Sequence, residues 1–130
     1  MPKTTPGTIA WHDLTVPDAA RVRDFYRAVV GWKPQAHAMG KYSDWSMLDP
    51  VSGKAVAGVC WKRGPNRKIP SQWLIYITVK NLKRSLAACR RKGGKVIDGP
   101  KNLGAYGDLA IIRDPGGAVA ALIQPPAPGR

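Results

Sequence analysis

Side chains that can move protons or bind metal ions are few in this sequence. All eight acidic residues are Asp, the only histidines are His12 and His37, and the only cysteines are Cys60 and Cys89. Without Glu, the chain has neither an HExxH-type zinc motif nor a Glu-based acid–base pair. The glycine-rich phosphate loops of nucleotide-binding folds are absent as well. The cysteines lack metal-site spacing and have apolar neighbours, which favours buried free thiols.

Asp13 is the best candidate for a catalytic residue. It lies in residues 8–16, a run rich in β-branched and aromatic side chains that predicts a strand. Because successive side chains of a strand point to opposite faces, Trp11, Asp13 and Thr15 share one face. His12 belongs to the other face, where we expect it to pack beneath a helix. A carboxylate at position 13 can accept a proton or anchor a ligand, or it can have only a structural hydrogen-bonding role.

The chain is strongly basic, with 21 Lys and Arg residues and a formal net charge of +13 over 130 residues. Such a charge attracts anionic partners, nucleic acids included. However, the positive residues are scattered along the chain, and no recognised nucleic-acid-binding pattern accompanies them. We therefore expect a solvated basic surface rather than a nucleic-acid-binding one.

The sequence repeats one arrangement of secondary structure twice. Helices are predicted at 18–30 and 81–92, and further strands at 32–38, 42–48, 55–61, 73–79, 95–98, 106–113 and 118–124. In the first helix an apolar stripe predicts the inner face, formed by Val22, Phe25, Tyr26, Val29 and Val30. The polar stretch 62–72 reads as a linker. The order is βαβββ, linker, βαβββ.

The offset between the two halves is steady, which indicates two copies of one unit. Asp18 and Asn81, which open the helices, are 63 residues apart, and Gly31 and Gly94, which end them, are 63 apart as well. Neither half is large enough to bury a sheet face alone, so the halves must pair. We predict one α+β domain at 7–124, with module 1 at 7–61, module 2 at 73–124, curved mixed sheets enclosing a cleft, and flexible tails at 1–6 and 125–130.

In this order and spacing, the motifs resemble the vicinal oxygen chelate superfamily of glyoxalases, bleomycin-resistance proteins and extradiol dioxygenases. The residues that carry the resemblance are the runs 11–18, 25–26 and 31–32 in the first half and 73–79, 93–94 and 114–117 in the second. The resemblance implies metal ligands on the first and last strand of each module. The matching positions here hold Trp11, Ala57 or Gly58, Leu74 and Ala121, so we expect no metal ion and no other cofactor.

A cleft between the modules would be the natural place for a small organic ligand. Strand alternation predicts Asp13 and the Tyr76 hydroxyl as its polar anchors. From the strand 42–48, either Trp45 and Met47 or Asp44 and Ser46 would point inward, and burial favours the apolar pair. The predicted ligand-binding set is Trp11, Asp13, Thr15, Trp45, Met47, Leu74, Tyr76 and Thr78. In the alternative, the aromatic rings merely fill the space between the sheets.

The resemblance and the residues together predict a glyoxalase-like protein without the usual metal ligands that binds or transforms an unidentified small organic molecule. If it is an enzyme, we expect a metal-independent glyoxalase, lyase or isomerase. The alternatives are an antibiotic- or drug-binding resistance-type protein and an anion- or nucleic-acid-binding module. The resemblance allows a homodimer. No stretch of the sequence is apolar over the length of a membrane span or a signal core, so we expect a cytoplasmic location without a membrane partner.

Overall fold

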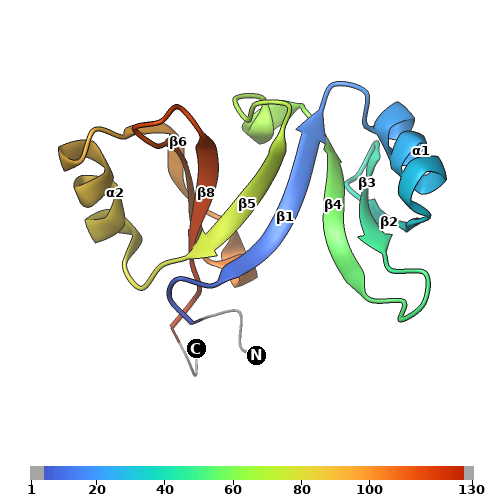
Figure 1. The fold of residues 1–130 in the computed structure, drawn as a ribbon, viewed down its shortest axis with the longest axis horizontal. Helices are drawn as coiled ribbons and strands as arrows, with labels where there is room; N and C mark the ends of the chain where they lie inside the picture. The colour runs from blue at the N-terminus through green and yellow to red at the C-terminus, as the bar shows by residue number, and fades with distance from the viewer. Residues whose placement is uncertain (1–4, 128–130) are drawn as a thin grey trace. The chain divides into compact units, whose positions relative to one another are not determined.

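The computed structural model describes residues 5–127. Its strands are β1 (Ile9–Val16), β2 (Lys33–Ala38), β3 (Ser43–Leu48), β4 (Ala55–Trp61), β5 (Trp73–Thr78), β6 (Lys95–Asn102), β7 (Asp108–Arg113) and β8 (Val119–Gln124), and its α-helices are α1 (Ala19–Val30) and α2 (Leu82–Arg91) (Figure 1). This confirms the predicted α+β fold of two βαβββ repeats. No helix within the described residues is long and apolar enough to cross a membrane.

The chain divides into two compact units. We call Trp11–Trp73 the first unit, and the residues up to Ala10 together with those from Leu74 onward the second unit. Residues 1–4 and 128–130, which belong to the predicted flexible tails, lie outside the described residues. The described part of the C-terminal tail, 125–127, has no regular secondary structure, whereas the Thr5 carbonyl accepts a hydrogen bond from the Thr8 N–H at 3.1 Å.

The sheet of the first unit has the strand order β2-β3-β4-β1, with β1 and β4 parallel and the other pairs antiparallel. β2 lies at the edge, as Pro34 predicts, because proline cannot donate a hydrogen bond to a second neighbour. The register defines the two faces. Gln35, Ser46, Gly58 and Asp13 are lateral neighbours on one face. The buried core lies on the face that α1 covers, and it consists of Leu14, Val16, Ala19, Met47, Ala57 and Val59.

α1 begins and ends where the sequence predicts. The Asp18 carboxylate accepts a hydrogen bond from the Arg21 N–H at 3.1 Å, and Gly31 ends the helix with a φ of 85°. The predicted inner stripe is only partly correct. Val22 and Tyr26 pack against the core, but the other three members of the stripe are at least half exposed: Phe25 at 55%, Val29 at 63% and Val30 at 50%. The helix contacts the sheet through Ala19, Val22 and Tyr26. The remaining apolar residues of the stripe therefore face solvent.

An aromatic cluster holds the end of α1 within the first unit. The indole N–H of Trp73 donates to the Tyr26 hydroxyl at 2.9 Å. The Tyr26 ring also packs against Trp32, with ring centroids 5.7 Å apart, and meets the Trp73 ring edge-on at 5.2 Å. Edge-to-face and offset-stacked rings at these separations stabilise a core beyond the area they bury.

The sheet of the second unit has the strand order β5-β8-β7-β6. Tyr76, Ala121 and Ile111 are lateral neighbours on the face opposite α2. On the other face, α2 buries Leu82 and Leu86 against Ala110 and Leu122. Residues just before β1 also belong to this unit, because the Gly7 N–H donates to the Thr78 carbonyl at 2.8 Å and the Thr78 N–H donates to the Thr8 carbonyl at 2.9 Å.

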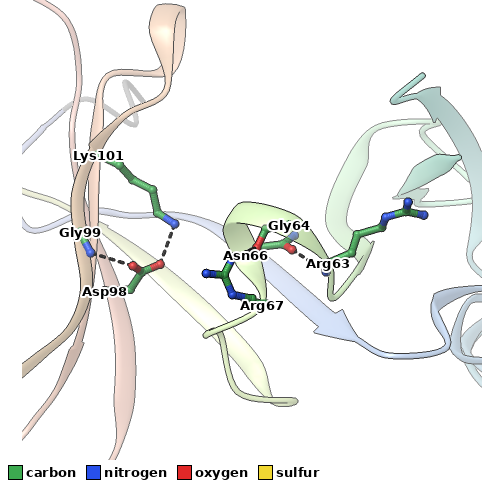
Figure 2. Close-up of polar contacts among 7 residues, drawn as sticks. All are labelled: Arg63, Gly64, Asn66, Arg67, Asp98, Gly99 and Lys101. Atoms are coloured by element: carbon green, nitrogen blue, oxygen red, sulfur yellow. Dashed lines mark hydrogen bonds and ion pairs between the residues drawn. The ribbon is translucent and has the colours of Figure 1, made fainter. Parts of the chain in front are cut away.

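β6 is longer than the sequence predicts. We expected a strand at 95–98 followed by a loop, but pairing with β7 continues to Asn102 with two register shifts. The shifts surround the Gly99–Pro100 peptide bond, which is cis. Figure 2 shows the Asp98 carboxylate of this bulge, which accepts hydrogen bonds from the Gly99 N–H at 3.0 Å and from the Lys101 ammonium at 2.6 Å. The bulge accommodates glycine and proline, which in most sequences are signals of a turn or loop.

The predicted linker 62–72 has structure of its own. It contains a 3-10 turn at Gly64–Asn66, in which the Asn66 side chain accepts a hydrogen bond from the Arg63 N–H at 2.9 Å (Figure 2). The Arg67 guanidinium donates to the Gly64 carbonyl at 3.1 Å, and Ile69 is buried. The segment is therefore a folded connection.

Candidate functional site

Asp13 and Trp11 form a hydrogen-bonded pair on the face of the first unit's sheet that α1 does not cover. The Trp11 indole N–H donates to Oδ1 of Asp13 at 2.6 Å, and both side chains are half-buried. The sequence predicts this shared face from strand alternation, and the hydrogen bond confirms it. A carboxylate oriented by a fixed N–H donor can accept a hydrogen bond or a proton from a ligand in a defined direction.

Gly58 on β4 makes room for this pair. It is the lateral neighbour of Asp13, and a Cβ built on it would overlap Oδ1 of Asp13 and lie 3.5 Å from the Trp11 indole nitrogen. The carboxylate therefore lies directly over the Gly58 backbone. The sequence marks Gly58 only as a metal-ligand position. The equivalent residue of the second repeat is Ala121, and the loss of its methyl group at position 58 was the available signal that a side chain approaches the backbone closely there.

Cys60 lies on the same face, because it is the lateral neighbour of Thr15. Burial raises the pKa of the Cys60 thiol, and the negative charges of Asp13 and Asp44 raise it further. The thiol is thus held neutral next to two carboxylates. We use the name Asp13 face for this surface, which is formed by Trp11, Asp13, Asp44, Ser46, Gly58 and Cys60.

The raised pKa of Cys60 leads to a labelling prediction. In a Cys89→Ala background, iodoacetamide at about pH 8 should alkylate folded Cys60 at least about tenfold more slowly than the urea-unfolded chain, because only the thiolate reacts. Asp13→Asn should speed the reaction of the folded protein by removing one negative charge. Mass spectrometry of the time course measures both rates. Asp24→Asn, at an exposed site on α1, is the matched control and should leave the rate unchanged. Equal rates for the folded and the unfolded Cys89→Ala protein would contradict the arrangement.

The preference for Trp45 and Met47 as inward-pointing residues is wrong. Both lie on the α1 side of the sheet, since Trp45 is the lateral neighbour of Val59 and Met47 of Ala57, and Met47 is fully buried in that core. The alternative pair, Asp44 and Ser46, shares the Asp13 face.

Two further contacts organise the outer strands of the Asp13 face. Asp44 accepts a hydrogen bond from the Trp61 N–H at 3.0 Å, which ties β3 to the end of β4. Ser46 lies with its hydroxyl oxygen 2.6 Å from Nε2 of His37, within hydrogen-bonding distance. His37 is exposed.

His12 does not pack beneath a helix. It is exposed, with Nδ1 3.3 Å from the carbonyl oxygen of Val56 on β4. The alternation that assigns it to the face opposite Asp13 does not bury it, because it lies before the part of β1 that α1 covers.

The remaining predicted ligand-binding residues are mostly buried. Thr15 lies on the same sheet face as Asp13, with 3% of its surface exposed. In the second unit, Leu74, Tyr76 and Thr78 lie on the sheet face opposite α2, where Leu74 and Thr78 are buried at 1% exposure and Tyr76 is half-buried. Their contribution to a ligand site stays a prediction.

The residues at the family's metal positions do not fit a metal ion. In the first unit these positions hold Trp11, whose indole N–H is a donor, and Ala57 or Gly58; in the second they hold Leu74 and Ala121. None of these side chains has a lone pair suited to a divalent cation. Across residues 5–127, no group of three His, Cys, Asp or Glu side chains is arranged to hold one. We therefore assign no chemistry to a metal ion in this chain.

Comparison with known proteins agrees with the fold. The model of the Glyoxalase/Bleomycin resistance protein/Dioxygenase superfamily matches residues 8–122. CFP32 of Mycobacterium bovis, whose name assigns it provisionally to the glyoxylases, is 28% identical over 119 residues, which are 92% of this chain and 44% of CFP32. The anthracycline biosynthesis protein DnrV of Streptomyces peucetius is 29% identical over 137 residues, covering 94% of this chain and 48% of DnrV. This chain therefore spans about half the length of these relatives.

A solved structure of similar fold is the methylmalonyl-CoA epimerase of Streptomyces coelicolor. It superposes with a TM-score of 0.56 and 14% sequence identity, over 95% of this chain and 97% of the epimerase. At that identity the likeness concerns the fold alone.

Proposed function

Because the chain belongs to the glyoxalase/bleomycin resistance protein/dioxygenase superfamily, we propose that it binds a small organic molecule on the Asp13 face without the help of a metal ion. The observation that carries the proposal is the Asp13 carboxylate, oriented by the Trp11 indole N–H over the bare backbone of Gly58. A carboxylate that only interacted with water could adopt another rotamer and would not require a glycine at position 58.

The chemistry of the Asp13 face suggests the class of ligand. Asp13 accepts hydrogen bonds, so the ligand should donate one, for example from a hydroxyl group. The half-buried Trp11 ring beside it favours a flat, apolar body. The name of the relative DnrV, an anthracycline biosynthesis protein, supports a polycyclic aromatic skeleton of this kind. A drug-binding resistance protein would also bind a polycyclic aromatic ligand. One binding experiment therefore tests both the proposed function and the drug-binding alternative.

2-Hydroxyanthraquinone, used in mildly acidic buffer where it is uncharged, is a suitable probe because its hydroxyl lies away from the quinone carbonyls, and its binding can be followed by fluorescence. We expect saturable binding that Asp13→Asn weakens about tenfold or more, because a hydrogen bond to a charged acceptor is about twice as strong as one to a neutral acceptor. The Asn side chain has nearly the same shape, so the variant should remain folded. Anthraquinone, which has no hydroxyl groups, should bind wild type and variant equally.

Asp24→Asn is the matched control, because it removes the same charge from an exposed site with a side chain 59% accessible. Gly58→Ala is a second variant, which displaces the carboxylate without removing it and should also weaken binding. If Asp13→Asn and Gly58→Ala both bind 2-hydroxyanthraquinone as tightly as wild type, the Asp13 face is not the site.

The alternative of an anion- or nucleic-acid-binding module rests on the net charge of +13. Binding to phosphates weakens steeply with added salt, whereas binding of an uncharged probe in a half-buried site does not. A salt titration therefore separates the two. A cytoplasmic location and a homodimer stay predictions.

A further inference from the structure

A cavity lies in the first unit, between α1 and the strands β2 and β3. Its volume is about 500 Å³, and it is lined by Arg23, Arg27, Lys33, Pro34, Ala36 and Trp45. Trp45 and Ala36 are lateral neighbours on the α1 side of the sheet. The cavity is therefore separated from the Asp13 face by the thickness of the sheet, and the proposed function does not use it.

Three of the six lining residues are cations, and one of them is already placed against an aromatic ring. The Arg23 guanidinium carbon lies 4.4 Å from the centre of the Trp45 ring. Asp24 holds Arg23 in this position by accepting a hydrogen bond from its Nε at 2.9 Å. Arg27 and Lys33 complete the cationic wall, so the cavity has three positive side chains and one neighbouring carboxylate.

The second repeat shows that Arg23 and Trp45 occupy core positions. Counted from the matching helix caps, Asp18 and Asn81, Arg23 occupies the position of Leu86, which is buried against the second unit's sheet. The strand registers match Trp45 with Ala110, a member of that packed cluster, and Lys33 with Lys95. In the second unit Leu86 and Ala110 pack together between helix and sheet. In the first unit the Arg23 guanidinium and the Trp45 indole take their places beside an open cavity.

Burial of Leu86 stabilises the second unit, so the presence of a charged residue, Arg23, at this position of the first repeat alone calls for a ligand that compensates the charge. The ligand must be anionic to meet Arg23, Arg27 and Lys33, and flat to lie along the Trp45 ring and the apolar surface of Pro34 and Ala36. Guanidinium groups bind phosphate and carboxylate in a bidentate manner, and they also stack on aromatic rings.

We propose that this cavity is a binding site for a planar aromatic anion, a ring system that carries a phosphate or carboxylate group. The anionic group binds to Arg27 and Lys33, and the ring packs against Trp45 and the stacked Arg23 guanidinium. The site is independent of the one on the Asp13 face, since the two lie on opposite faces of the same sheet.

Isothermal titration calorimetry with naphthyl phosphate tests the site. We expect saturable binding to one site, with affinity at least about tenfold higher than that of inorganic phosphate, which has no ring, or of methoxynaphthalene, which has neither an anionic group nor a hydroxyl group. Arg23→Leu introduces the residue of the second repeat, so it should remain folded and should weaken binding at least about tenfold. Lys33→Gln, on the exposed edge strand, should weaken binding as well. Because this substitution is at an exposed position, it tests the site even if Arg23→Leu fails to fold.

Arg84→Leu is the matched control, because it removes one exposed arginine from α2 and leaves the cavity intact. It should change the affinity less than about twofold. Equal losses for Arg84→Leu and Arg23→Leu would show that only the net charge attracts the probe and would overturn the proposal. So would equal affinities for naphthyl phosphate and inorganic phosphate, or the absence of saturable binding.

Discussion

Replacing Met47 with alanine should lower the free energy of unfolding by about 2–5 kcal/mol, the range for removing a large side chain from a closed core. Met47 has no exposed surface and lies in the core that joins α1 to the first unit's sheet, together with Leu14, Ala57 and Val59. Its removal would leave a cavity that β-strand neighbours on both sides cannot fill. Urea denaturation followed by circular dichroism gives the change from the transition midpoints.

Met39→Ala is the matched control for this measurement. Met39 is the same residue type in the turn after β2, but it is half exposed. Its replacement should change the free energy of unfolding by less than about 0.5 kcal/mol. If Met47→Ala has an effect as small as that of Met39→Ala, Met47 is not part of a closed core.

Gly107→Ala should destabilise the protein by about 3 kcal/mol or more, because two unfavourable terms of about 1–3 kcal/mol each combine. Gly107 has a φ of 99° and a ψ of −154°, a conformation that only glycine adopts readily. A Cβ at this position would also overlap the carbonyl oxygen of Gln124. That carbonyl cannot move away, because Gln124 pairs with Asp108 in the sheet.

Gly117→Ala separates the two terms in the same experiment. Gly117 has a similar φ of 92°, but nothing lies within 4 Å of a Cβ built on it. It should therefore show only the conformational term, about 1–2 kcal/mol. If Gly107→Ala is no more destabilising than Gly117→Ala, the close approach to Gln124 does not exist in solution.

The parts of the fold that the sequence predicts well are those set by local signals. Asp18 and Asn81 cap the two helices as their residue types suggest, and the constant offset between them identifies the repeat. The β6 prediction failed because Gly99 and Pro100 are usually turn residues, and only pairing with β7 shows that they form a bulge. The prediction of the inner face of α1 was only partly correct, because periodicity identifies the apolar side of a helix but not how much of that side the sheet covers.

The candidate site shows the same division between local and long-range information. Alternation within β1 correctly joins Trp11 and Asp13, since both belong to one strand. Alternation within β3 could not choose between Trp45 and Ser46, because the choice depends on the register of β3 against β4. Hydrophobicity favoured the tryptophan, which in fact lies beneath Arg23 on the other face. Gly58 gains its role only from a neighbour 45 residues away in sequence, Asp13.

The hydrogen bonds between Thr78 and the residues just before β1 have a consequence for synthesis on the ribosome. The first unit is one continuous segment, Trp11–Trp73, which is synthesised before most of the second repeat. The second unit is discontinuous, because it needs Gly7 and Thr8 from the beginning of the chain as well as everything after Trp73. Gly7 and Thr8 therefore cannot form their hydrogen bonds with Thr78 until β5 has been synthesised. In a co-translational hydrogen-exchange assay, the first unit should be protected from exchange before residues 7 and 8 are.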